Sequence, residues 1–232
     1  MTTQLDSFVV WDLETTSKWS NHARVVEYAV ANFERFLISP LGCTISARTC
    51  PDSIRYHAVA AEWRHCSTYT SRVDPGESVP REASAIHGIY DHDVVSAPST
   101  RQALPMLLSS LHGQIVVGYN ILAYDFDVLR NECRRHGLDA TWLDCINSLR
   151  GIVDVMPWAA RTTQAPQYRR GARTLSTMSR RHGVVLESAH AAADDAVACG
   201  HLMLSLMSNG AMPAGLSDVV EATMSTWQHL RQ

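Results

Sequence analysis

The chain has 232 residues, a formal net charge of −3 and an apolar fraction of 46%. This length suits one domain, and the apolar fraction supports a sizeable core, which excludes a wholly disordered chain. No apolar run approaches the roughly 20 residues of a membrane-spanning helix, and no signal peptide is recognised. Six cysteines without a Cys-x-x-Cys pair indicate reduced thiols. We therefore expect a cytoplasmic protein with no membrane partner.

Residues 8–16 form the stretch on which the interpretation depends. Four consecutive apolar residues, rich in β-branched and aromatic types, predict a short buried strand. Asp12 and Glu14 stand two residues apart at its end, so both carboxylates leave the same face of the strand. Such carboxylates repel each other unless a hard cation such as Mg²⁺ lies between them. By itself, this motif also fits a strand that ends in solvent.

The rest of the chain alternates between predicted strands and helices. Strands are expected at 24–33, 62–73 and 114–118, and 142–146 fits either a short strand or the start of a helix. Helices are predicted at 80–87, 99–111, 126–136, 174–182, 193–207 and 217–230. Pro105 should kink the second of these or mark its true start. The pattern predicts an α/β domain, with a mixed sheet flanked by helices on both faces and a site beside the strand ends.

Further acids lie at the starts of two predicted helices. In the 126–136 helix, helical phase places Asp125 toward the sheet and Asp127 on the polar face. Asp125 could equally be the N-cap of this helix. In the 193–207 helix, Asp195 heads the buried stripe, whereas Asp194 lies on the wetter side. A buried carboxylate needs a partner, and a cation would supply one.

His190 stands five residues before Asp195, which is about 140° away around a helix, so it would not share the stripe of Asp195 even if the helix extended that far. We expect it in the loop before the helix, where it could approach the acids. A single histidine in a chain with 11 is more often structural, so its closeness to Asp195 is what makes it a candidate.

These motifs together resemble the three exonuclease motifs of the DEDDh 3′–5′ exonucleases, the family of the proofreading subunit of bacterial DNA polymerase III. The motifs are Asp12-Leu13-Glu14, then Tyr119-Asn120 with Asp125, and last His190 with Asp195. The segments 73–76, 86–89 and 117–120 also resemble the family, and the resemblance covers roughly 8–34 and 68–206. The chain departs from the family pattern at Tyr119, Tyr124 and Ser17, where His, Phe and Gly are common.

The resemblance implies a ribonuclease H-like fold and a two-metal phosphodiesterase. Asp12, Glu14 and Asp195 would hold the first of two divalent ions, Mg²⁺ or Mn²⁺. Asp12 would bridge both ions, and Asp125 would help to hold the second. His190 would take the proton from the attacking water. The residues implied at the substrate are Leu13, Thr15, Thr16, His87 and Asn120.

The implied activity is metal-dependent 3′–5′ exonuclease cleavage. It would release nucleoside 5′-monophosphates from single-stranded or frayed DNA or RNA 3′ ends. Three alternatives stay open: an RNA-processing exoribonuclease, a proofreading subunit that docks on a polymerase through 217–230, and an inactive nucleic-acid-binding relative. The presence of all five catalytic candidates argues against the last. A homodimer is a further possible assembly.

We expect a single exonuclease domain over 1–232, with an unusual insertion at 35–67 and a C-terminal helical extension at 211–232. The insertion fits either a structural zinc site or an extended hairpin that happens to carry cysteines. Its candidate ligands are Cys43, Cys50, His57, His65 and Cys66. An arginine-rich segment at 161–181 fits either a solvated loop or a flap that contacts a nucleic-acid backbone. It contains Arg161, Tyr168, Arg169, Arg170, Arg173, Arg180 and Arg181.

Overall fold

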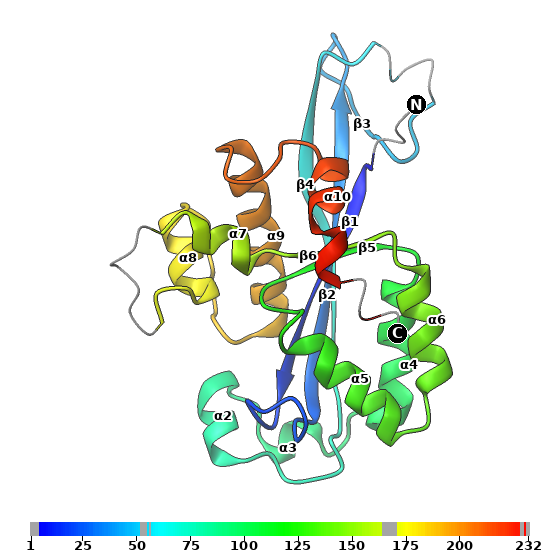
Figure 1. The fold of residues 1–232 in the computed structure, drawn as a ribbon, viewed down its shortest axis with the longest axis vertical. Helices are drawn as coiled ribbons and strands as arrows, with labels where there is room; N and C mark the ends of the chain where they lie inside the picture. The colour runs from blue at the N-terminus through cyan, green and yellow to red at the C-terminus, as the bar shows by residue number, and fades with distance from the viewer. Residues whose placement is uncertain (1–4, 52–54, 56, 164–170, 228–229, 231–232) are drawn as a thin grey trace.

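A computed structural model describes residues 5–51, 55, 57–163, 171–227 and 230, and it shows a six-stranded mixed sheet with helices on both faces (Figure 1). The strands are β1 (Ser7–Thr15), β2 (Val25–Ile38), β3 (Thr44–Ser46), β4 (Ala60–Arg72), β5 (Ile115–Gly118) and β6 (Gly151–Asp154). Their order is β3-β2-β1-β5-β6, and β4 also pairs with β2. β2 is antiparallel to β1, β3 and β4, whereas β1, β5 and β6 are parallel to one another.

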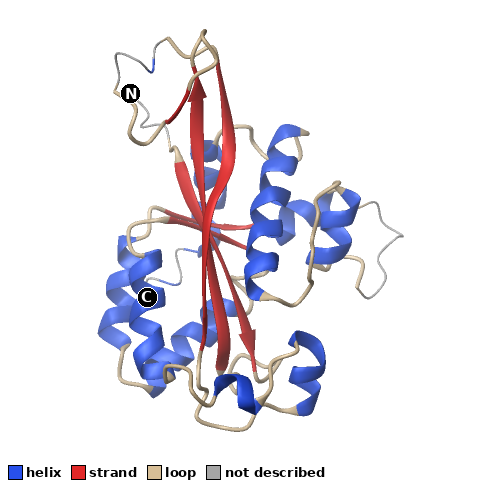
Figure 2. Cartoon of the chain, turned by 180° about the vertical axis from the view of Figure 1, so that it is seen from behind, coloured by secondary structure: helices blue, strands red, loops and turns tan. Residues whose placement is uncertain are grey.

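The helices form the two outer layers of the molecule (Figures 1 and 2). They are α2 (Arg81–His87), α3 (Asp91–Val94), α4 (Thr100–Leu111), α5 (Asp125–Arg135), α6 (Asp139–Ser148), α7 (Met156–Arg161), α8 (Leu175–Arg181), α9 (Ala192–Ser208) and α10 (Leu216–Trp227). The apolar residues of α4, α5 and α6 cover one face of the sheet, and those of α8 and α9 cover the other. No helix among the described residues is long and apolar enough to cross a bilayer.

Side-chain alternation along β1 decides which residues face which layer. Val9 and Trp11 pack in the cluster of α4–α6, whereas Phe8 and Val10 pack in the cluster of α9. By the same alternation, Asp12 and Glu14 belong to the α9 face. The expectation that one face carries both carboxylates therefore holds, and that face is the one that α9 covers.

Two glycines, one at the end of β5 and one in the middle of α9, allow close approaches to the central strands. A Cβ at Gly118 would lie 2.2 Å from Ile121 Cγ2 and 3.1 Å from the Trp11 carbonyl oxygen. A Cβ at Gly200 would lie 2.4 Å from the ring of Phe33 on β2. Neither position has room for a side chain. The turn after β5 and the middle of α9 can therefore lie close against the central strands.

The structure differs from the sequence-based expectation in several short elements. Of the two alternatives for residues 142–146 the helical one holds, since they lie inside α6, but the strand that follows, β6, was not expected. All four residues of β6 are buried, and such a short apolar run has no period that distinguishes a strand from a helix. The short helices α3 and α7 were also not expected. Pro105 lies inside α4, which begins at Thr100, so Pro105 does not mark its start.

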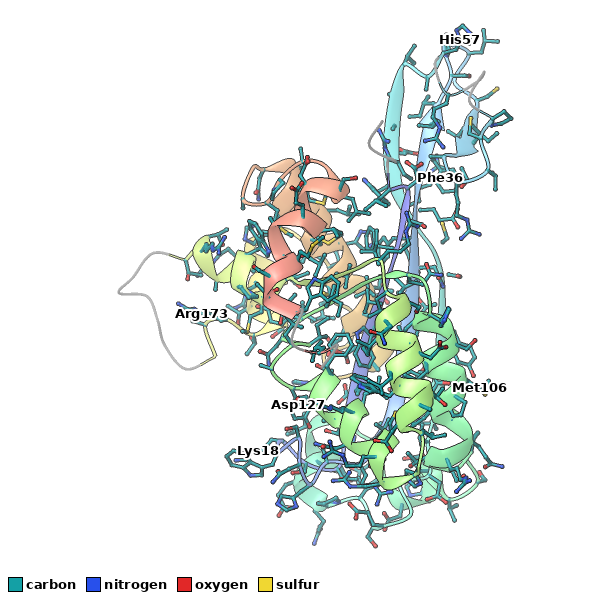
Figure 3. The ribbon with its side chains drawn as sticks, turned by 45° about the vertical axis from the view of Figure 1, so that its right-hand side comes forward. Lys18, Phe36, His57, Met106, Asp127 and Arg173 are labelled. Carbon is teal, nitrogen blue, oxygen red and sulfur yellow. The ribbon has the colours of Figure 1, made fainter. Side chains whose placement is uncertain are left out.

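The insertion forms an arm in which β2, β3 and β4 extend beyond the rest of the sheet (Figures 1 and 2). Leu37, Ala47 and Cys50 form a small core of its own. Of the cysteines and histidines expected as zinc ligands, none joins a group of three possible metal ligands within the described residues. The insertion is thus an extended hairpin that carries cysteines. His57 lies at its tip, at the opposite end of the molecule from Lys18 (Figure 3).

Candidate active site

Four carboxylates from three elements meet beside the ends of the parallel strands. Asp12 and Glu14 come from β1, Asp125 is the first residue of α5, and Asp195 lies in the first turn of α9. Glu14 is 8% exposed and Asp125 is 5% exposed, whereas Asp12 and Asp195 are half-buried. The ends of parallel strands are where α/β folds place their sites. The fold thus gathers these acids from segments that are up to 183 positions apart in the chain.

The carboxylates interact strongly with one another. Burial, and then the charges of Asp195 and Glu27, raise the pKa of Glu14 to about 8. Burial and the charges of Asp125, Asp195 and Glu14 raise the pKa of Asp12 well above its usual range. Burial is also the largest cause of the raised pKa of Asp125. Several buried acids without a neutralising charge are unfavourable. Their oxygen ligands suit a hard divalent cation, so the donor set fits the metal that the sequence predicts.

Glu14, His190 and Asp195 form the tightest group in the site. One possible ligand atom from each lies within 4.8 Å of the others, which is the only such group of three among the described residues. The His190 backbone N–H donates a hydrogen bond to Asp195 Oδ2 at 3.0 Å. His190 lies in the loop before α9 with a φ of 66°, a left-handed conformation that is unfavourable for a non-glycine residue. The loop position agrees with the expectation for His190.

The paired acids differ in how well helical phase predicted them. Asp125 is buried and Asp127 is exposed, as expected. The N-cap of α5 is Tyr124, so Asp125 is not the cap. Asp194 and Asp195 are both half-buried, so the contrast expected between these two is weaker in the structure. Both lie in the first turn, where the end of the helix leaves room for solvent.

A cleft of about 980 Å³ opens beside these acids, between the end of β1 and helix α2. Its lining includes Leu13, Thr15, Thr16 and His87, four of the five residues expected at the substrate. Trp19, also in the lining, is 64% exposed. Asn120 does not line this cleft. Its backbone N–H donates to Asp154 Oδ1 at 2.9 Å in the turn between β5 and α5, and a contact of Asn120 with substrate stays a prediction.

Helix α5 holds the loop that forms one wall of the cleft. Glu132, which is fully buried, accepts hydrogen bonds from Arg24 Nε at 2.8 Å and Arg135 Nη1 at 2.6 Å. Arg135 also donates to the carbonyl of Ala23 at 2.9 Å. At the other end of the loop, the Arg24 backbone N–H donates to Thr16 Oγ1 at 3.0 Å. Helix α5, which carries Asp125, thus also fixes the loop between β1 and β2 that forms this wall of the cleft.

Comparisons with known proteins agree with this arrangement. A family model described as an exonuclease, of the ribonuclease T type, matches residues 55–203, more than half of the chain. The chain belongs to this exonuclease family. The resemblance to 3′–5′ exonucleases is thereby confirmed at the level of the family. The matched region contains Asp125, His190 and Asp195, whereas Asp12 and Glu14 precede it.

Solved structures of exonuclease I share the fold of this exonuclease. The Escherichia coli enzyme in complex with a dT13 oligonucleotide is 17% identical, with a TM-score of 0.61, over 88% of this chain and 41% of that chain. The zinc-bound complex of the same enzyme with single-stranded DNA is 15% identical, with a TM-score of 0.65, over 98% and 44%. This exonuclease thus spans less than half the length of the chains that it matches. A search of curated protein sequences found no match.

Sequence reasoning missed two acids of the exonuclease site. Glu27 lies on β2 directly opposite Glu14 in the antiparallel pair, and Asp154 ends β6. Asp154 is buried and accepts hydrogen bonds from the backbone N–H groups of Asn120, Leu122 and Met156. Asp154 was not identified because the strand that it ends, β6, was not recognised in the sequence. Glu27 could have been found from the predicted pairing of the first two strands, but only if their register had been known.

The arginine-rich segment is only partly described. Arg161 lies over the ring of Trp158 at 4.7 Å, and the Arg173 carbonyl accepts a hydrogen bond from the Tyr119 hydroxyl at 2.6 Å. Tyr168, Arg169 and Arg170 lie outside the described residues. Whether this segment contacts nucleic acid therefore stays a prediction.

In a chelator, the exonuclease should lose stability as the pH rises from about 5 to 8. The raised pKa of Glu14, about 8 against ~4.3 in an unfolded chain, means that the folded state binds more protons across this range. Stability then falls with increasing pH. If ~2 kcal/mol of this effect is expressed, Tm falls by ~4–8 °C. Thermal unfolding in EDTA across this range measures it.

The control for this prediction is Glu14→Gln, which removes the titrating group and should flatten the slope. Added Mn²⁺ should raise Tm most at high pH, because protons compete least with the cation there. Identical slopes for the parent protein and Glu14→Gln in EDTA would contradict the assignment of the effect to Glu14.

Proposed function

We propose that this chain is a metal-dependent 3′–5′ exonuclease that releases nucleoside 5′-monophosphates from single-stranded or frayed DNA ends. The observation that carries the proposal is the group of Glu14, His190 and Asp195 beside a cleft of about 980 Å³. In this arrangement Glu14 and Asp195 are hard metal ligands, His190 is a proton acceptor, and the cleft has space for a nucleotide. Membership of the exonuclease family supports the reaction class.

Asp12, Glu14 and Asp195 would hold one divalent ion, and Asp12 with Asp125 would hold a second, as Mg²⁺ or Mn²⁺. When bound, such ions neutralise the charge of a phosphodiester and stabilise the oxygens that attack and leave. The raised pKa values of Asp12 and Glu14 are consistent with the assignment, because burial and then the charges of neighbouring acids raise them, and a bound cation would offset that repulsion. The buried position of Glu14 and Asp125 excludes water from one side of the group.

His190 would accept the proton of the attacking water. A neutral imidazole can do this near physiological pH, whereas a carboxylate engaged by a cation is a poor acceptor. Its exposed position in the loop before α9 leaves the ring accessible to substrate. The hydrogen bond from its backbone N–H to Asp195 keeps it beside the acids while the side chain stays free to act.

Thr15, Thr16 and His87 would contact the terminal nucleotide, since they line the cleft beside Glu14. The exposed Trp19 at the same cleft offers an aromatic face of the kind on which unpaired bases stack. We propose single-stranded DNA as the substrate because the matched exonuclease I structures include complexes with dT13 and single-stranded DNA. The corresponding RNA reaction is the alternative that the assay below separates.

The packing of the last helix, α10, argues against a polymerase contact through its buried face. Val219 and Val220 of α10 pack in the cluster of α9, and Trp227 packs in the cluster of α4–α6. These apolar residues of α10 are therefore engaged within this chain, whereas Met224 on the same helix is exposed. A partner that needed them would have to displace this helix from the edge of β6.

The function is tested with end-blocked strands. A single-stranded DNA with a free 3′-OH should be shortened one nucleotide at a time, and a 3′-phosphorothioate-capped strand should resist by at least ~100-fold. A 5′ block should have no effect, and the product should comigrate with nucleoside 5′-monophosphate. The same set in RNA reports the sugar preference. Cleavage of a circular single strand at the linear rate would contradict an exonuclease.

A further inference from the structure

The helix that carries Asp195 has no cap of its own. The N-cap residue of α9 is Ala191, and no side-chain hydrogen bond from that position caps the helix. Alanine is among the poorest N-cap residues, because it offers no acceptor for the free N–H groups of the first turn. The N-terminus of this 17-residue helix, whose first turn carries Asp194 and Asp195, thus lies at the centre of the proposed active site without a side-chain cap from Ala191.

Glu27 supplies the missing acceptor from the sheet. Its Oε2 accepts a hydrogen bond from the Ala192 backbone N–H, the first residue of α9, at 3.3 Å. Glu27 is 9% exposed, and it lies on the same face of the sheet as Glu14, which is its cross-strand partner. A carboxylate at a helix N-terminus is favourable both as an acceptor and as a negative charge.

The other oxygen of Glu27 faces a third element. Oε1 lies 3.4 Å from Arg72 Nε at the end of β4, and it accepts from Thr70 Oγ1 at 3.4 Å. One carboxylate therefore connects β2, β4 and the start of α9. Arg72 offsets the charge of Glu27, which makes a buried carboxylate here less costly.

The segment that this carboxylate holds contains two of the proposed active-site residues. His190 and Asp195 lie on either side of Ala192, and the His190 backbone N–H donates to Asp195 Oδ2. The left-handed backbone of His190 is unfavourable by itself, so contacts around it must hold it. The contact at Ala192 lies two residues away from His190 and joins its loop to the strand opposite Glu14.

We propose that Glu27 is a positioning residue, which caps α9 from the sheet and holds His190 and Asp195 against Glu14. It acts through the hydrogen bond to Ala192 and is not itself a metal ligand. This inference rests on the proposed exonuclease function for its catalytic consequence. The placement of the helix end is independent of that function.

Two conservative variants separate the hydrogen bond from the charge. Glu27→Gln keeps the reach and an acceptor oxygen but loses the charge. Glu27→Asp keeps the charge but shortens the side chain by one methylene, so it no longer reaches Ala192. We expect Glu27→Gln to retain kcat within ~3-fold and Glu27→Asp to lose ~10–100-fold, the range seen when residues that orient metal ligands are removed. KM for a DNA strand should stay within ~2-fold in both.

Hydrogen exchange without nucleic acid supplies a second readout. Amides 191–195 should exchange faster in Glu27→Asp and at the parental rate in Glu27→Gln. Glu34→Ala is the matched control, because Glu34 also lies on β2, with Ser46 and Arg48 as its partners in the arm. It should change neither kcat nor exchange at 191–195. Circular dichroism confirms that each variant is folded.

Two results would overturn the inference. Equal loss of Mn²⁺ binding in Glu27→Gln and Glu27→Asp, measured by calorimetry, would make Glu27 a ligand. Parental exchange at 191–195 in Glu27→Asp would show that the hydrogen bond does not hold the helix end. If the parent protein cleaved no strand, the proposed function would fail, yet the exchange comparison would still decide the role of Glu27.

Discussion

Cleavage should stop in EDTA and return when Mg²⁺ or Mn²⁺ is restored, and Asp12→Ala should lower it by ~10³-fold or more. Asp12 lies at the centre of the acids, since burial and then the charges of Asp125, Asp195, Glu14 and Glu27 all raise its pKa. A residue that contacts both proposed ions contributes several kcal/mol of transition-state stabilisation, and each ~1.4 kcal/mol is a factor of ten in rate. Single-turnover cleavage of a labelled strand measures the loss.

The matched controls are acids that stand one or two positions from the proposed ligands in the sequence. Asp125→Asn should lose most activity, whereas Asp127→Asn should keep most, because Asp125 is buried beside Glu14 and Asp127 is exposed. Asp195→Asn and Asp194→Asn form the second pair. We expect Asp195→Asn to lose more activity than Asp194→Asn. Cleavage that persists in chelator, or a reversed order in either pair, would refute the assignment of the metal ligands.

Removal of the imidazole in His190→Ala should slow the chemical step by ~10²–10⁴-fold, the usual cost of losing a general base. Substrate affinity should change little. Single-turnover cleavage by both proteins measures the loss, with His92→Ala, an exposed histidine on α3, as the control that should keep the parental rate.

Metal binding decides between the two roles that the structure allows for His190. Its ring lies close enough to Glu14 and Asp195 to share a cation with them. Calorimetry with Mn²⁺ should give similar affinities for the parent protein and His190→Ala if the residue is the base. A large loss of Mn²⁺ affinity would make it a ligand, and cleavage at the parental rate would make it incidental.

The hydrophobic periodicity of the sequence was enough to predict most long helices and strands and to single out the candidate acids. The alternation around Asp12 and Glu14 placed both on one face, and helical phase separated buried Asp125 from exposed Asp127. These inferences depend on local periodicity, which is a property of consecutive residues. The order of the three motifs was enough to indicate the exonuclease family, which the family match confirms.

Only the tertiary structure decided which side chains meet. Glu27 stands 13 positions from Glu14, and the strand register alone places the two side by side. Asp154 ends a strand too short to have a recognisable period, and its carboxylate accepts the backbone N–H of Asn120 in the neighbouring turn. Strand register and helix docking are set by contacts between distant segments, such as Gly200 against Phe33. Such contacts leave no periodic trace in the sequence, because each partner follows only its own local pattern.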